Sequence, residues 1–92
     1  MSVKATKPTI LKELKVIPGI GKSISVDLYD LGIRKVSDLK EQDPEKMYQK
    51  SNAMRGVVQD RCLLYVLRCA VYYASHARHD PEKLKWWNWK DK

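Results

Sequence analysis

The feature that most constrains this chain is its longest apolar stretch, residues 57–75. At about 100° per residue, its amphipathic side chains fall within one narrow arc, made of Arg61, Tyr65, Arg68 and Tyr72. Nearly all the rest of the circumference is apolar: Val58, Cys62, Leu63, Leu64, Val66, Leu67, Cys69, Ala70, Val71 and Ala74. A helix of this kind is buried. We therefore expect an all-α domain of about five short helices packed around one long central helix.

Capping residues and apolar spacing predict two short helices near the N-terminus. The first is expected from Thr9 to Val16, because the Pro18-Gly19 pair that follows stops a helix. The second is expected from Lys22 to Leu31, with Gly32 as its C-cap glycine. The strand signals are weak, since no long alternating run is present.

Two repeated Asp-Pro-Glu-Lys stretches predict further helix starts, at residues 43–46 and 80–83. Each combines an N-cap aspartate, a proline at the first helical position and an acid in the first turn. We expect the first of these helices to end near residues 51–52, and the second to lead into a Trp-rich tail over 80–92. A short helix capped by Ser37 is expected to reach Leu39.

Length and charge bound the class of protein. The 92 residues suit one domain, expected over 8–92. Lysine and arginine total 18 and aspartate and glutamate 11, a net charge of +7. Residues 1–35 hold seven basic and three acidic side chains, a net charge of +4. A basic N-terminal third suits a polyanion such as nucleic acid, although it also serves solubility.

Residues 17–23, IPGIGKS, end like a nucleotide-binding P-loop. That loop requires a glycine where Val16 stands, and it follows a strand rather than a helix. The alternative is a tight turn between two helices, whose N–H groups at the second helix point toward a phosphate. In such a turn we expect Ile20 to tuck back between the two helices.

Residues 11–33 resemble a helix-hairpin-helix motif. The resemblance implies that the hairpin binds DNA backbone without reading sequence, often with a monovalent cation held by turn carbonyls of residues 17–22. The DNA-binding residues would be Gly19, Ile20, Gly21, Lys22 and Ser23. A hairpin used only for packing, or against another protein, stays open.

Such motifs often occur in pairs, and about residues 44–75 resemble a degenerate second copy. Its turn, NAMRG at 52–56, keeps Gly56 but lacks the Pro-Gly pair. We therefore expect this copy to be structural, with Arg55 as a candidate for contact with a backbone phosphate.

The resemblance extends over residues 8–91 to the small bacterial "pathogenicity locus" helix-hairpin-helix family, whose members are often named mitomycin resistance proteins. The stretches that carry it are IPGIGKSISVDLYDLGI, DPEKMYQK, QDRCLLYVLRCAVYYA and DPEKLKWWNWKD. It implies the fold and DNA contact rather than a defined biochemical role.

Several remaining features allow two interpretations. Arg61 and Arg68 are secondary candidates for DNA contact, yet they also suit the one wet edge of a buried helix, paired with Asp60 and other acids. The three tryptophans of the tail could stack on bases, but packing onto the core is the simpler role. The pair His76 and His79 lacks further well-spaced ligands, so we expect surface histidines and no metal.

Cys62 and Cys69 would lie about 10 Å apart along one helix, beyond the roughly 7 Å that a disulfide allows. We expect both as small core side chains, with reduced thiols in a cytoplasmic protein. No stretch approaches the roughly 18 apolar residues of a membrane span, so no membrane partner is expected.

The pattern contains no nucleophile with a nearby base, paired acids or metal constellation. We therefore expect a non-enzymatic, sequence-independent DNA-backbone-binding module. The alternative is an adaptor that uses the scaffold or the tail against a DNA-repair or competence protein. The oligomeric state is open.

Overall fold

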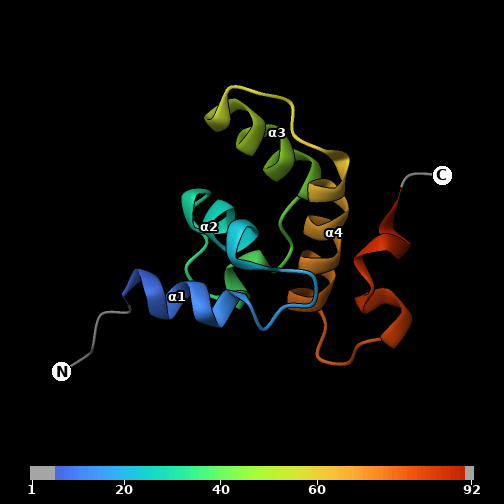
Figure 1. Ribbon diagram of the computed structural model, residues 1–92. Helices are drawn as coiled ribbons and strands as arrows, with labels where there is room; N and C mark the ends of the chain where they lie inside the picture. The colour runs from blue at the N-terminus through green and yellow to red at the C-terminus, as the bar shows by residue number, and fades with distance from the viewer. Residues whose placement is uncertain (1–5, 91–92) are drawn as a thin grey trace.

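The computed structural model describes residues 6–90 and confirms the all-α class. Within this range lie four α-helices, three short 3₁₀ helices and no strand (Figure 1). In chain order they are α1 Lys7–Leu14, α2 Lys22–Asp30, η1 Val36–Leu39, α3 Pro44–Arg55, α4 Arg61–Ser75, η2 Pro81–Leu84 and η3 Trp86–Trp89. The last two residues of the expected tail, 91 and 92, lie outside the described residues.

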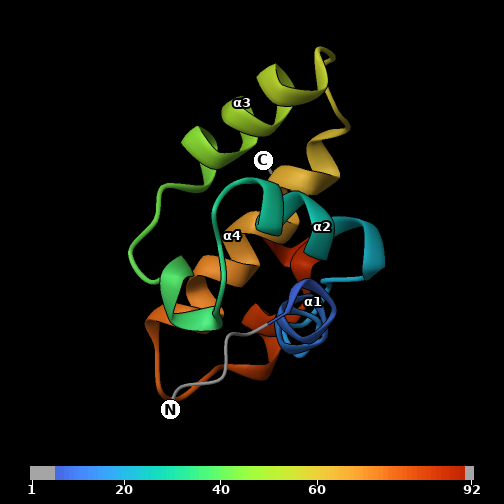
Figure 2. The same ribbon diagram turned by 90° about the vertical axis from the view of Figure 1, so that its left-hand side faces the viewer.

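Helix α4 stands between two groups of elements. In Figure 1 the η2–η3 tail runs along one side of α4, with α1 and α2 on the other and α3 across one end. Figure 2 views the molecule from the α1 side, where α1 and α2 lie in front of α4 and the tail behind it. Helix α4 packs against α3, η1, η2 and η3, while α1 packs against α2. The expectation that the chain is built around this helix is therefore confirmed.

The core forms where α4 meets the other elements. Six of its side chains are buried: Leu63, Leu64, Val66, Leu67, Cys69 and Ala70. Leu14 from α1, Leu28 from α2 and Leu39 from η1 are fully buried in the same cluster. Burying one such leucine contributes about 1.5–3 kcal/mol. Leucines from four different elements thus hold the turn between α1 and α2 to the rest of the molecule.

The starts of α4 and α1 differ from the expected ones. Helix α4 begins at Arg61 rather than at 57, because Asp60 is its N-cap and accepts a hydrogen bond from the Cys62 N–H at 2.8 Å. Val58, counted in the apolar face, is 87% exposed in the preceding loop. Helix α1 begins at Lys7, before Thr9, since a proline is tolerated in the first turn of a helix.

The capping residues of α3 explain its length. Asp43 caps its start as expected, accepting from the Glu45 N–H at 2.9 Å and the Lys46 N–H at 3.4 Å. The helix continues past 51–52 to Arg55, because Gly56 is its left-handed C-cap with φ 69°. Gly32, at φ 93°, follows α2 as expected, although α2 ends at Asp30.

The tail after Asp80 forms two 3₁₀ turns instead of the expected helix. Trp86 is half-buried against the core, and the indole N–H of Trp89 donates to the Lys83 carbonyl at 2.7 Å. Trp87 is 49% exposed. Packing therefore accounts for two of the three tryptophans.

One expectation about burial is half right. Cys69 is buried, but Cys62 is exposed, because it lies in the first turn of α4 beside the cap rather than on the core face. Both thiols are free. Among residues 6–90, no helix is both long and apolar enough to cross a membrane.

Candidate nucleic-acid interface

A tight turn at residues 15–21 joins α1 to α2. The backbone N–H of Ile17 donates to the Leu14 carbonyl at 3.2 Å, and that of Ile20 donates to the Ile17 carbonyl at 3.1 Å. The side chains of Ile17 and Ile20 are 1% and 6% exposed, so the turn is anchored from inside as expected for Ile20. Gly19 has φ 85°, a conformation that favours glycine.

The start of α2 is open to solvent. Its N-cap is Gly21, in an extended conformation, and no side chain caps the helix. Gly21, Lys22 and Ser23 are all exposed. The first N–H groups of an α-helix have no partner inside the helix. Together with the helix dipole and the Lys22 charge, they form an arrangement that favours an anion.

The starts of α3 and α4 are closed by comparison. A carboxylate caps each of them, from Asp43 and Asp60 respectively. Hydrogen bonds from Cys62, the backbone N–H first, hold the pKa of Asp60 below its ordinary value. A carboxylate in this position occupies N–H donors and repels a phosphate. Of these three helix starts, α2 is therefore the one suited to an external anion.

The structure brings the five expected hairpin residues together in one turn and helix start. Gly21, Lys22 and Ser23 present both backbone and exposed side-chain atoms. Ile20 is buried, so it offers a ligand only its backbone. Gly19 lies against the tail, since a Cβ placed on it would stand 3.1 Å from Cδ1 of Trp86.

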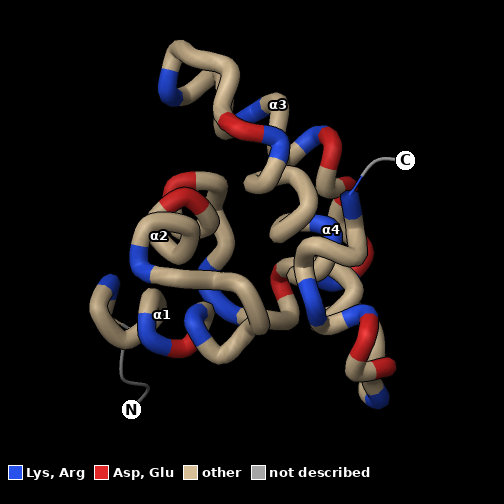
Figure 3. Tube along the Cα trace, turned by 45° about the vertical axis from the view of Figure 1, so that its right-hand side comes forward, with Lys and Arg blue, Asp and Glu red and all other residues tan. Residues whose placement is uncertain are grey.

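Basic side chains surround this turn. Lys12 on α1 and Lys15 at the start of the turn are exposed, as is Lys22. In Figure 3, blue segments with one red segment between them occur along α1, a blue segment marks the start of α2, and the far end of α2 is red. Positive charge is thus placed at the end of α2 where its N–H groups emerge.

Arg55, a secondary candidate, is engaged within the protein. Its Nε donates to Asp27 Oδ1 at 3.0 Å, and its Nη2 donates to the same oxygen. This hydrogen bond and the charge of Asp27 raise the pKa of Arg55. Asp27 is 6% exposed, so the pair ties α3 to a buried acid of α2. Whether Arg55 also contacts DNA stays a prediction.

Arg61 and Arg68 lie on α4. Arg61 is exposed in its first turn. Arg68 donates to the Trp89 carbonyl at 2.8 Å and to Glu45 at 2.9 Å. The polar edge of α4, which the sequence suggested would face solvent, is therefore partly covered by the tail. The acid that pairs with Arg68 comes from α3.

His79 packs at the other end of α4. Its ring stacks on Tyr73 at a centroid distance of 4.6 Å, and its Nε2 lies 2.7 Å from the Tyr73 carbonyl. Within residues 6–90, no group of three or more histidine, cysteine, aspartate or glutamate side chains is arranged for a metal ion.

Two features were missed from the sequence. The first is the contact of Trp86 with Gly19, which no local pattern signals because 67 residues separate the two positions. The second is a network in the α3–α4 loop. There Asn52 Oδ1 accepts from the backbone N–H and from the side-chain amide of Gln59, at 3.0 and 3.1 Å. The Tyr48 hydroxyl donates to the Gln59 carbonyl.

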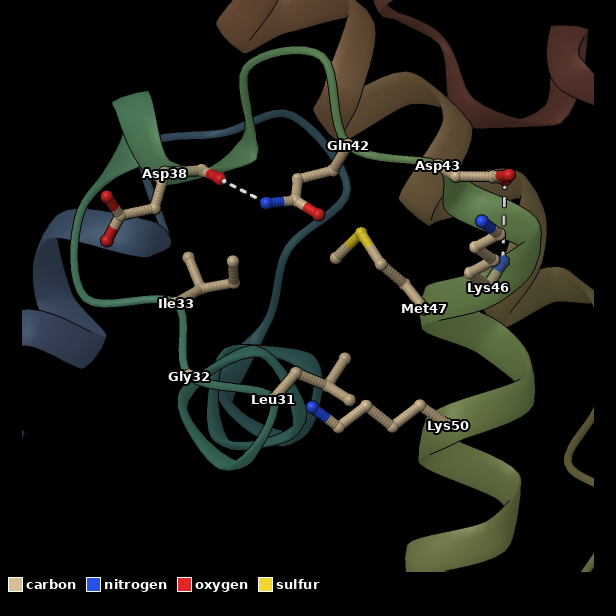
Figure 4. A pocket seen from close by; sticks show the side chains of 9 residues that line it. All are labelled: Leu31, Gly32, Ile33, Asp38, Gln42, Asp43, Lys46, Met47 and Lys50. Atoms are coloured by element: carbon tan, nitrogen blue, oxygen red, sulfur yellow. Dashed lines mark hydrogen bonds between the residues drawn. The ribbon is translucent and has the colours of Figure 1, made fainter.

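A cavity of about 400 Å³ lies between the end of α2, η1 and α3 (Figure 4). Leu31, Ile33 and Met47 give it an apolar floor. Its acids have structural partners: Asp38 accepts from the Arg34 and Lys35 N–H groups, and Asp43 caps α3. It opens at the carbonyl end of α2, where the helix dipole disfavours an anion.

The fold and the turn define a small all-helical protein with an exposed, uncapped helix start beside a basic surface. The chain belongs to the pathogenicity locus family, Cdd1, whose model matches residues 7–92. It is 27% identical over 77 residues to "Mitomycin resistance protein McrB" of Streptomyces lavendulae. The aligned region covers 84% of this chain and 70% of that protein. No solved structure matches the chain.

Proposed function

We propose that this protein is a non-enzymatic, cytoplasmic module that binds the DNA backbone without reading its sequence, through a helix-hairpin-helix formed by α1, the 15–21 turn and α2. The observation that carries the proposal is the start of α2: Gly21, Lys22 and Ser23 are exposed and no side chain caps the helix. The McrB relative is named a mitomycin resistance protein, and our proposal includes a link to DNA repair or damage resistance.

The chemistry of this site suits a polymer backbone. Phosphate contacts carry no sequence information, so binding is sequence-independent. Contact with about two to four phosphates gives a slope of log K against log salt of about −2 to −4 on duplex DNA. A single site of this size binds with a dissociation constant on the order of 10⁻⁴–10⁻⁶ M. Tighter binding then requires a dimer or a partner.

A charge-matched pair of variants tests the proposal. Lys22→Glu reverses the charge at the helix start, while Lys50→Glu makes the same reversal on α3, beside the cavity of Figure 4. In a fluorescence anisotropy titration with a labelled duplex at low salt, Lys22→Glu loses binding and Lys50→Glu keeps most of it. Equal effects of the two substitutions would show that only net charge matters.

A monovalent cation at the carbonyls of residues 17–22 is a further part of the proposal. Such an ion would bridge the turn and a phosphate oxygen. Duplex affinity is then higher in potassium than in a bulky organic cation at equal ionic strength. Equal affinity in the two salts would contradict the bound ion but leave the N–H site intact.

An adaptor function is the alternative, and exposed apolar side chains favour it. Trp87 is 49% exposed on the tail, and Met54, Val57 and Val58 are exposed around the α3–α4 loop. A partner such as a DNA-repair or competence protein would cover one of these surfaces. If neither the wild type nor Lys22→Glu binds duplex DNA, while Trp87→Ala abolishes capture of such a partner, the adaptor function is the correct one.

A further inference from the structure

A second cavity, of about 340 Å³, lies directly beside the 15–21 turn. Gly19 and Ser23 line it on one side, and Asp60 and Cys62 at the start of α4 line it on another. Trp86 of the tail forms a further wall. A ligand pocket of a few hundred Å³ is of ordinary size for a small organic group. Any group attached to a phosphate at the turn would therefore find this cavity next to it.

The walls of the cavity suit a flat apolar ring. Besides Trp86, the side chains of Ile24, Leu63 and Val66 line it. Trp86 is held in place, because it packs against Gly19 and lies edge-on to Trp87 at a centroid distance of 5.8 Å. A pre-positioned indole is a sequence-tolerant surface for base stacking. The cavity thus offers an aromatic wall that does not need to be ordered on binding.

The polar groups of the cavity are rich in hydrogen-bond acceptors. Asp27, Gln59 and Asp60 line it. When ionised, the two carboxylates accept hydrogen bonds and donate none. Asp60 uses Oδ1 for the Cys62 N–H and Asp27 uses Oδ1 for Arg55, and a carboxylate has capacity for further donors. The exocyclic amino groups of cytosine and adenine are such donors, whereas thymine presents a carbonyl and a methyl group at the same edge.

We propose that this cavity takes one unpaired nucleobase with an exocyclic amino group at its major-groove edge, cytosine or adenine, while its backbone phosphate lies on the start of α2. The inference rests on the proposed function and adds the class of DNA that this site prefers. A base inside a duplex is stacked and paired, so it cannot enter a side-chain-lined cavity without leaving the helix. The protein therefore prefers single-stranded or gapped DNA rich in cytosine or adenine.

Cys62 provides a direct test, because it is an exposed thiol in the wall of the cavity. Cys69 is an internal control, since it is buried, and burial raises its pKa to about 11. The pKa of Cys62 is also raised, by its hydrogen bond to Asp60, but its thiol is exposed to the reagent. The rate of maleimide labelling at Cys62 is measured by mass spectrometry, with and without saturating oligonucleotide. A cytosine homopolymer slows labelling by about tenfold when about nine tenths of the protein is bound. A thymine homopolymer or a duplex leaves the rate nearly unchanged.

The same labelling with free nucleosides separates this inference from the proposed function. Deoxycytidine lacks a phosphate, so its protection of Cys62 depends on the cavity alone, and thymidine is its matched control. Protection by deoxycytidine without any duplex binding would overturn the proposed function and keep the cavity. Duplex binding without protection by the cytosine homopolymer would overturn the cavity and keep the function.

A filling variant gives a second, independent readout. Cys62→Phe adds a ring from an exposed position, so the fold is expected to tolerate it, which an unchanged melting temperature verifies. This variant binds the duplex like wild type and loses the preference for the cytosine over the thymine homopolymer. A preference that survives in Cys62→Phe would contradict the inference.

Discussion

The two helix connections of this protein differ in how they use their polar backbone groups. The α1–α2 turn is held from inside by Ile17 and Ile20 and leaves the start of α2 exposed and without a side-chain cap. The α3–α4 loop instead closes on itself, through Asn52, Gln59 and the cap at Asp60. One connection presents its donors to solvent, and the other satisfies them internally.

The difference shows how a small change of residues alters the electrostatics of a helix start. Where the first connection has Gly21, the second has Asp60, so one helix start attracts an anion and the other repels it. In both connections a glycine with positive φ makes the turn possible, at Gly19 and Gly56. The backbone shape is thus shared in part, and the capping residue decides the chemistry.

The largest effect is expected from giving the first connection the capping acid of the second. In Gly21→Asp the new carboxylate occupies the N–H groups of α2 and repels phosphate, so duplex affinity falls about 10- to 100-fold, as for loss of a hydrogen bond to a charged group. A Cβ on Gly21 meets nothing within 4 Å, and aspartate is a good N-cap, so the melting temperature is unchanged or higher. Gly21→Ala is the uncharged control and keeps most of the affinity. Loss of affinity in both variants would mean that shape rather than charge is read.

The second prediction compares the two glycines with positive φ. Gly56→Ala lowers the free energy of unfolding by about 1–2 kcal/mol, through its left-handed conformation alone, because its Cβ would meet open space. Gly19→Ala has a similar conformational cost and is destabilised further, because its Cβ would stand 3.1 Å from Cδ1 of Trp86. Chemical denaturation should therefore rank Gly19→Ala as the less stable variant. The reverse order would show that the tail does not pack on the turn.

The third prediction concerns the closed loop. Asn52→Ala leaves the backbone N–H and the side-chain amide of Gln59 without their acceptor, which costs about 1–3 kcal/mol of unfolding free energy. Duplex affinity, measured well below the melting temperature, stays within about twofold of wild type because α2 is untouched. A parallel loss of affinity would indicate that the second connection also contacts DNA.

The smallest effect is expected in acid. The pKa of Asp60 is lowered in the folded state by hydrogen bonds from Cys62, so its ionised form stabilises the protein above the ordinary value of 3.8. That contribution disappears as the pH falls through the lowered pKa. Between about pH 5 and about pH 2, wild type therefore loses more thermal stability than Asp60→Asn. Identical pH profiles would show that the cap carries no charge-dependent stability.

Much of the helical framework could be predicted from local signals. Asp43 at a helix start, Gly32 after α2 and the apolar circumference of α4 each act through neighbours a few residues away. The start of α4 was misjudged because Val57 and Val58 continue the apolar pattern although Asp60 caps the helix. A carboxylate that accepts a hydrogen bond from an N–H group of the first turn outweighs hydrophobic periodicity at a helix end.

The candidate site was predicted only in its local part. The turn residues could be read from IPGIGKS, because the glycines and the helix start are adjacent in the chain. The cavity beside it could not, since it is assembled from the turn, the start of α4 and Trp86. The pairing of Arg55 with Asp27 likewise joins residues 28 positions apart, which no periodicity encodes.

A nuclear magnetic resonance titration of labelled protein with a short duplex tests most directly whether the uncapped start of α2, and not the capped start of α4, contacts DNA. The uncapped start of α2 predicts that the backbone N–H signals of Gly21, Lys22 and Ser23 shift together as duplex is added. The signals of Arg61 and Cys62, which follow the capped start of α4, remain in place. Shifts at Arg61 and Cys62 equal to those at Lys22 and Ser23, or none at α2, would contradict the account.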